Sequence, residues 1–117
     1  MTRPHARGRL PDVGPAEAAA LLADEDAVLL DVREPDEWAA GHAPQARHLP
    51  LGELREEAVP PGRTIIAVCR SGNRSAKAAD LLATAGFPVH NLAGGMKAWA
   101  QAGQAVVTDS GRTGTVA

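Results

Sequence analysis

Short apolar runs alternate along the chain with segments in which apolar residues recur at helical spacing. The runs at 27–32 and 64–68 are almost continuously apolar, which is typical of strands buried on both faces of a parallel sheet. A first strand would lie at a sheet edge, because Pro11 cannot donate a backbone hydrogen bond to a neighbour. The sequence therefore predicts five strands, in the segments 10–13, 27–32, 46–49, 64–68 and 88–92.

The segments between these strands predict helices. Pro15 suits the first turn of a helix, so it marks where the first helix begins. The helices are expected at 15–23, 35–40, 51–58, 76–85 and 96–102. The fourth carries apolar residues at i, i+3, i+4 and i+7, which we expect to face the core: Ala78, Leu81, Leu82 and Ala85. Alternating strands and helices predict an α/β fold, with a parallel sheet of about five strands and helices on both faces.

Length and composition indicate a single globular domain. The chain has 117 residues, of which 44% are hydrophobic and 22% charged, and its net charge is −2. This small charge favours neither nucleic acid nor an anionic membrane surface as a partner. No apolar run has the length of a transmembrane helix, and the N-terminal segment lacks the apolar stretch of a secretory signal. We expect a mobile arm at 1–9, a domain at 10–108, and a disordered Gly-, Thr- and Ser-rich tail at 109–117.

Cys69 is the only cysteine, and it stands where a predicted strand turns into a helix. A lone thiol excludes an intramolecular disulfide and fits a reducing, cytoplasmic setting, and the histidines lack metal-ligand spacing. The unpaired amides and dipole of a helix start favour thiolate over thiol. Arg70 and Arg74 add positive charge, and Gly72 permits a tight turn. The segment therefore predicts a cradle for an anionic sulfur, because two arginines beside an inert buried thiol would be costly to desolvate.

The cysteine segment resembles the active-site loop of the rhodanese family, which are sulfurtransferases. Its residues are Cys69-Arg70-Ser71-Gly72-Asn73-Arg74-Ser75. Two further segments resemble the same family, Leu30-Asp31-Val32-Arg33-Glu34 with Trp38 and His42, and Leu92-Ala93-Gly94-Gly95-Met96 with Trp99. Together they span roughly residues 28–107 and imply the single-domain form of the family. In the family pattern, four residues between cysteine and arginine fit a sulfur atom, whereas five, as in related phosphatases, fit a phosphate; this chain has four.

The resemblance implies sulfur transfer through a persulfide on Cys69. The donor would be an anion such as thiosulfate, and the acceptor cyanide in the test tube and a thiol or a protein in the cell. The remaining loop residues would hold the transferred sulfur: Arg70, Ser71, Gly72, Asn73, Arg74 and Ser75. No metal or organic cofactor is implied. Without a second cysteine, the acceptor must come from outside the chain.

Three other functions are compatible with the same segments. One is a persulfide relay for a dedicated partner, which shares the chemistry and differs in the acceptor. Another is a rhodanese-fold module that binds partners without catalysis, although such modules often lack the cysteine. The third is a phosphatase or arsenate reductase of the same fold, which the short loop disfavours.

Two charged residues after the strand at 27–32 are candidates for a supporting role. Asp31 either hydrogen-bonds loop amides near the active site or caps the turn that follows it. Arg33 either faces the pocket and attracts an anion or pairs with Glu37 at i, i+4 spacing. For Arg74, we expect the guanidinium to be fixed by a neighbour such as Glu34 or Asp31.

The aromatic and glycine residues of the flanking segments favour structural roles. Trp38 and Trp99 lie on the inner faces of predicted helices, where core packing is expected. His42 has no acid–base partner in the sequence and is expected to be structural. Gly94-Gly95 could bind phosphate at a helix start, but close packing of that helix is the expected reason for the pair.

Overall fold

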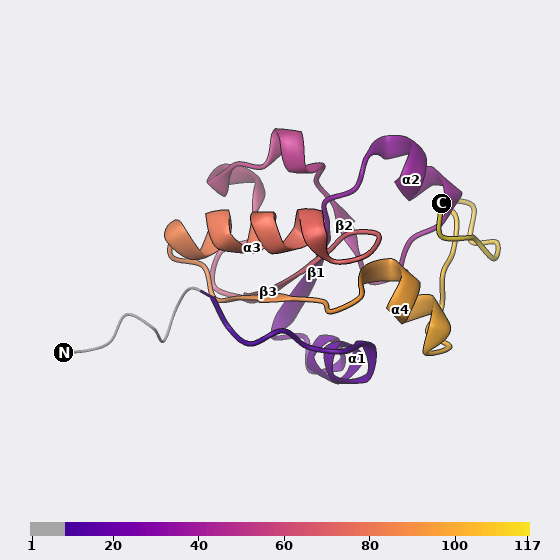
Figure 1. The fold of residues 1–117 in the computed structure, drawn as a ribbon, viewed down its shortest axis with the longest axis horizontal. Coiled ribbons are helices and arrows are strands. Elements are labelled where there is room, and N and C mark those ends of the chain that lie inside the picture. Colours follow the sequence, from indigo (N-terminus) through magenta and orange to yellow (C-terminus); the bar gives the residue numbers. More distant parts are fainter. Residues whose placement is uncertain (1–8) are drawn as a thin grey trace.

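The computed structural model describes residues 9–117. The expected arm at 1–9 therefore lies outside the described residues, apart from Arg9. The elements follow the predicted alternation of strand and helix (Figure 1). In chain order they are α1 (Pro15–Ala23), β1 (Ala27–Asp31), α2 (Pro35–Ala40), β2 (Arg47–His48), the 3-10 helices η2 (Leu51–Glu53) and η3 (Glu56–Ala58), β3 (Thr64–Val68), α3 (Asn73–Thr84), β4 (Val89–Asn91) and α4 (Gly95–Gln101).

The strands form one parallel sheet in the order β2-β1-β3-β4. Four strands are present in the described residues where the sequence predicted about five. The segment expected as a first strand lies beside β4, but only isolated bridges join them, between Arg9 and Val89 and between Val13 and Leu92. Pro11 stands between the two bridges and has no amide hydrogen to extend the pairing. The edge position was therefore predicted correctly, while regular pairing does not develop.

Helices cover both faces of the sheet, as predicted. α3 lies over one face, and α1 and α4 lie on the other (Figure 1). Side chains along β1 alternate between the two resulting cores: Val28 and Leu30 pack with α3, while Leu29 packs in the cluster that contains Trp99. The sheet is thus buried on both sides, which explains the nearly continuous apolar runs. Among the described residues, no helix has the length and apolar character needed to cross a membrane.

Two helix predictions need correction. The weak helix expected at 51–58 is broken into η2 and η3, because Arg55 between them is extended, with φ −153°. In α3, Leu81 is 52% exposed and Ala85 is also exposed, so the prediction that these two residues face the core was wrong. The buried stripe keeps helical spacing but starts elsewhere, at Ser75, Ala78, Ala79 and Leu82. The helix begins at Asn73 rather than at Ala76, so the three residues before the predicted start also belong to it.

The C-terminal segment is packed against α2, in contrast to the expected disordered tail. His42 and Val107 exchange backbone hydrogen bonds of 2.9 and 2.8 Å. Further on, the amide of Thr115 donates to the Ala40 carbonyl at 2.9 Å, and Val116 packs against the core cluster that contains Trp99. The Gly-, Thr- and Ser-rich composition gave no indication of these apolar and backbone contacts, which join the segment to α2 and to the core.

Candidate active site

Cys69 stands at the carboxyl end of β3, between the strand and the start of α3. Gly72 caps the helix in a left-handed conformation, with φ +111°, which explains why glycine is needed there. The cysteine side chain is 1% exposed. The structure thus confirms the predicted position of the only thiol at a strand-to-helix turn.

Hydrogen-bond donors of the loop surround the sulfur. The Gly72 amide nitrogen lies 3.1 Å from Cys69 Sγ, and the Ser75 hydroxyl oxygen lies 3.2 Å from it. Burial raises the pKa of the Cys69 thiol, but the Ser75 hydroxyl and the amides of Ser75, Gly72 and Ser71 lower this pKa by more, so it lies below its ordinary value of 9.0. The loop therefore favours the thiolate mainly through short-range donors, whereas the sequence suggested arginine charge as well.

The start of α4 holds the backbone of this loop. The Met96 amide donates to the Cys69 carbonyl at 2.7 Å, and the Lys97 amide to the Arg70 carbonyl at 3.0 Å. In a trans peptide the carbonyl and the following N–H point in opposite directions. The Arg70 carbonyl, drawn toward α4, therefore turns the Ser71 amide the other way, and this amide is among the donors that lower the pKa of Cys69. Gly95 permits this contact, since a Cβ there would lie 2.5 Å from the Cys69 carbonyl oxygen, and close packing is thus the role of the glycine pair.

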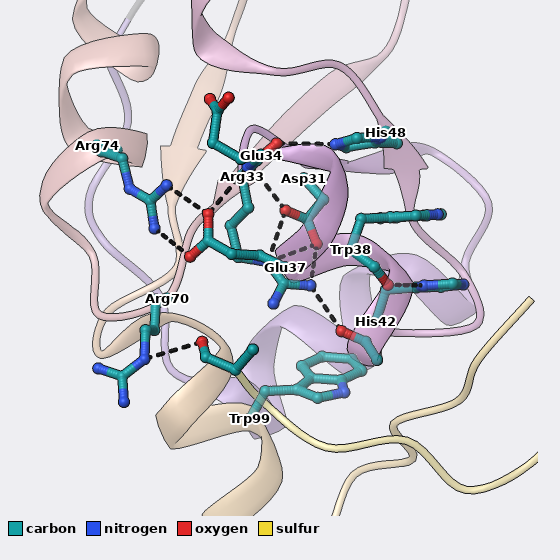
Figure 2. Close-up of polar contacts among 12 residues, drawn as sticks. Asp31, Arg33, Glu34, Glu37, Trp38, His42, His48, Arg70, Arg74 and Trp99 are labelled. Atoms are coloured by element: carbon teal, nitrogen blue, oxygen red, sulfur yellow. Dashed lines mark hydrogen bonds and ion pairs between the residues drawn. The ribbon is translucent and has the colours of Figure 1, made fainter.

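Arg74 forms a two-point ion pair with Glu37 on α2. Its guanidinium nitrogens lie 2.7 and 2.8 Å from the two carboxylate oxygens (Figure 2). This contact is the main reason that the pKa of Glu37 falls from 4.5 to about 2. The same carboxylate accepts the Glu34 amide at 2.9 Å and caps α2. A fixed Arg74 was predicted, but the partner is Glu37, and the suggested Glu34 and Asp31 do not take that place.

The other residues of the loop lie nearer to solvent. Arg70 is exposed, and its Nε donates to the Ala117 carbonyl oxygen at 3.0 Å (Figure 2). Ser71 and Asn73 are also exposed, whereas Gly72 and Ser75 are buried beside the sulfur. The loop therefore presents an inner, buried set of donors and an outer rim.

Asp31 and Arg33 form a fully buried ion pair. Arg33 Nη2 lies 2.8 Å from Asp31 Oδ2 and donates to the Gly41 carbonyl at 2.8 Å (Figure 2). Asp31 also accepts the Arg33 amide at 3.1 Å, which ties the turn after β1. Neither suggested role for Arg33 applies, because its guanidinium lies at 0% exposure and binds Asp31 and Gly41 in place of Glu37. The pair connects the end of β1 to the end of α2.

The two tryptophans differ in environment. Trp99 is 0% exposed and belongs to the core, as predicted. Trp38 is only half-buried and lies between two imidazoles, with ring centroids 3.5 Å from His42 and 4.8 Å from His48 (Figure 2). A ring nitrogen of His42 lies 2.8 Å from the Trp38 carbonyl oxygen, a structural contact. The core prediction was therefore wrong for Trp38.

Asn91 completes the surroundings of the sulfur and was missed from the sequence. Its side chain is 4% exposed, and its Oδ1 lies 2.6 Å from the Ser75 hydroxyl oxygen. A polar residue at the carboxyl end of a buried parallel strand is the signal that could have identified it. A hollow of about 690 Å³ lies at the opposite end of the sheet, beside Asp26, Thr64 and Pro88. Cys69 and Asn91 thus stand at the carboxyl ends of β3 and β4, away from this hollow.

Comparison with known proteins gives the same assignment. The family model of the rhodanese-like domain matches residues 14–102. A sulfurtransferase of Allochromatium vinosum is 42% identical over 94 residues, which cover 77% of this chain and 88% of that protein. A rhodanese-related protein from Thermoplasma volcanium superposes with a TM-score of 0.77 at 29% identity, covering 84% of this chain and 98% of that one.

A larger protein contains a similar domain. The structure of a thiosulfate sulfurtransferase from Pseudomonas aeruginosa matches with a TM-score of 0.75 at 31% identity, covering 92% of this chain and 22% of that one. The chain described here therefore belongs to the rhodanese-like domain family.

Proposed function

We propose that this protein is a sulfurtransferase that carries sulfane sulfur as a persulfide on Cys69. The observation that supports the proposal most directly is the buried Cys69 sulfur, which faces the Gly72 amide at 3.1 Å and the Ser75 hydroxyl at 3.2 Å. Both donors stabilise a thiolate, and after it has reacted the loop amides stabilise the negative outer sulfur of the persulfide. The sulfurtransferase names of the relatives in Allochromatium and Pseudomonas support the same chemistry.

The first half-reaction uses an anionic donor such as thiosulfate. The Cys69 thiolate attacks the outer sulfur, a new S–S bond forms, and the bond to the sulfite sulfur breaks with its electron pair leaving on sulfite. The negative charge of the thiolate thereby leaves with sulfite, and the outer sulfur of the persulfide keeps the negative charge that it carried in thiosulfate. Because Cys69 is 1% exposed, the donor reaches it with a small terminal atom while its bulkier group stays at the rim. In this proposal Arg70, which is exposed at the rim, attracts that group.

The second half-reaction needs an acceptor from outside the chain, because Cys69 is the only cysteine. A thiophilic acceptor bonds to the outer sulfur, and the electron pair of the broken S–S bond returns to Cys69. Cyanide serves as such an acceptor in an assay, and a thiol or a protein thiol is proposed for the cell, including a dedicated relay partner. A reducing compartment such as the cytoplasm would keep this thiol available.

Steady-state kinetics with thiosulfate and cyanide test the proposal. We expect sulfite and thiocyanate to form with parallel double-reciprocal lines, the pattern of a ping-pong mechanism. Cys69→Ser should abolish the activity and leave the melting temperature nearly unchanged, since the two side chains are close in size. Activity near the wild-type level in Cys69→Ser would refute the mechanism. Hydrolysis of p-nitrophenyl phosphate without sulfur transfer would favour the phosphatase alternative instead.

A further inference from the structure

Ser75 and Asn91 form a buried hydroxyl–amide pair directly beside the sulfur of Cys69. The Ser75 hydroxyl oxygen lies 2.6 Å from Asn91 Oδ1, 3.2 Å from Cys69 Sγ and 3.4 Å from the Gly72 carbonyl oxygen. The Ser75 and Asn91 side chains belong to residues that are 0% and 4% exposed. A hydroxyl has a single proton, so Ser75 can donate to only one of these three acceptors at a time.

The Gly72 carbonyl determines which way the Asn91 amide faces. This oxygen can only accept, so the atom of Asn91 that faces it, at 3.3 Å, must be the donor Nδ2. The acceptor Oδ1 is then turned toward Ser75 and requires the hydroxyl proton. The short distance of 2.6 Å agrees with this donation. It follows that lone pairs of Ser75, and not its proton, face the sulfur of Cys69 in this arrangement.

We propose that Asn91 controls the access of the Ser75 proton to the sulfur of Cys69, and is thereby a positioning residue of the site. When Sγ is neutral, as in the thiol or the persulfide, the Ser75 hydroxyl donates its hydrogen bond to Asn91 Oδ1. When Sγ is anionic, the hydroxyl donates to the sulfur instead, and Asn91 Oδ1 then lacks a donor in a buried position, which is costly. Asn91 therefore restrains the ionisation of Cys69 that the loop amides favour.

The consequence for catalysis rests on the proposed function. When an acceptor removes the outer sulfur, the electron pair of the S–S bond returns to Cys69 Sγ. As that charge develops, the Ser75 hydroxyl turns from Asn91 to the sulfur, so the stabilisation appears in the transition state rather than in the persulfide. When the thiolate later attacks a sulfur donor and loses its charge, the Ser75 hydroxyl turns back and donates its hydrogen bond to Asn91 Oδ1 again. The pair thus adapts to both states of the sulfur.

Three of the charged groups around the loop are engaged with partners other than the sulfur. Arg74, on α3, is paired with Glu37 of α2, and Asp31 at the end of β1 is paired with Arg33. Arg70 bonds to a backbone carbonyl. The other exposed cations on the helices that flank the loop are Lys77 of α3 and Lys97 of α4. Changes at residue 91 leave all of these groups in place, so a shift in the thiolate midpoint reports on the hydroxyl.

The thiolate of Cys69 can be titrated directly by its ultraviolet absorbance, since the chain has one cysteine. Asn91→Leu keeps the size of the side chain and removes the competing acceptor. We expect its thiolate midpoint to move to lower pH. Alkylation below the midpoint should be about threefold faster, because a roughly tenfold gain in thiolate is partly offset by lower nucleophilicity. In a Ser75→Ala background, Asn91→Leu should leave the midpoint unmoved.

Controls separate this role from a structural one. His90→Leu changes the residue next to Asn91 on β4. The His90 ring contacts the Pro11 carbonyl, so this change should leave the thiolate midpoint unchanged. If Asn91→Leu does not fold, Asn91→Asp replaces it; this variant keeps an acceptor and should raise the midpoint more with Ser75 than in Ser75→Ala. An unmoved or raised midpoint in Asn91→Leu, or an equal shift without Ser75, would overturn the inference. No sulfur donor is present in these titrations, so their outcome is independent of whether Cys69 forms a persulfide.

Discussion

Arg70 and Arg74 stand in the same loop, yet their guanidinium groups have different surroundings. Arg74 is held by both oxygens of Glu37, whereas Arg70 is exposed at the rim. We expect Arg70→Ala to raise the KM for thiosulfate several-fold with little change in kcat, because it removes attraction shared by the ground and transition states. The effect should shrink as salt is added, since the interaction is screened. Steady-state kinetics at low and high ionic strength measure it.

Arg74→Ala should act differently on the same site. It removes the partner of Glu37 and is expected to lower turnover and destabilise the fold by about 1 kcal/mol, which corresponds to several degrees in melting temperature. Thermal melting and kinetics of both variants decide between the two roles. If Arg70→Ala lost stability while Arg74→Ala changed only KM, the assignment of roles would be reversed.

Glu37 links the site to the pH dependence of stability. Its pKa is lowered from 4.5 to about 2 in the folded protein, chiefly by the contact with Arg74. The unfolded state therefore takes up this proton first, and the stabilisation is complete above about pH 4.5 and is lost as the pH falls toward 2. Denaturant unfolding should show a higher free energy of unfolding for wild type than for Glu37→Gln near neutral pH. This difference should disappear as the pH falls over the same interval. A difference independent of pH would argue against the ion pair as its source.

At the residue level, the sequence predicts the candidate site at Cys69 better than it predicts which side chains contact one another. Cys69 and its loop are contiguous, so their spacing and their position after a strand mark them as the candidate site. The partner of Arg74 is 37 positions away, and several carboxylates of the same segment were equally plausible in sequence. Asn91 supplies one polar side chain within an apolar strand, and only the folded arrangement brings it to Ser75. Pairing across elements therefore needed the structure.

At the level of elements, α4 positions the cysteine loop through its first turn. A Cβ on Gly95 would lie 2.5 Å from backbone atoms of Cys69 and Arg70, and its φ is +62°. We expect Gly95→Ala to destabilise the protein by roughly 3–5 kcal/mol and to slow alkylation of Cys69, because the loop must move. Gly103→Ala is a matched control, with φ +81° and no atom within 4 Å of its Cβ. It should cost only about 1–2 kcal/mol and leave alkylation unchanged.

Comparable losses in Gly95→Ala and Gly103→Ala would mean that backbone strain alone matters at Gly95.

The sequence favoured close packing for Gly95 but could not say against what. Helix faces were also only partly predictable. The apolar pattern of α3 suggested Leu81 as a core residue, yet the buried stripe includes Ser75, which faces the sulfur. A polar residue thus occupies the inner face, where a hydrophobic pattern cannot show it.

At the level of the whole molecule, the parallel sheet and its two helical layers were predictable, because alternation along the chain determines them. The docked C-terminal segment was not, because its contacts are mostly backbone hydrogen bonds. We expect hydrogen exchange at the Val107 and Thr115 amides to be slower than in an unstructured chain, since both donate to carbonyls beside α2. Gly41→Ala should release this protection, as its Cβ would lie 2.5 Å from the Thr115 carbonyl oxygen. Exchange at unstructured rates in wild type would contradict the docked segment.

The central claim, that Cys69 carries transferable sulfur, is tested most directly by intact-mass spectrometry after treatment with thiosulfate. We predict a gain of one sulfur atom per chain, located on Cys69, which disappears on addition of cyanide and does not form in Cys69→Ser. An unchanged mass after thiosulfate, or a sulfur adduct that forms equally in Cys69→Ser, would contradict the account.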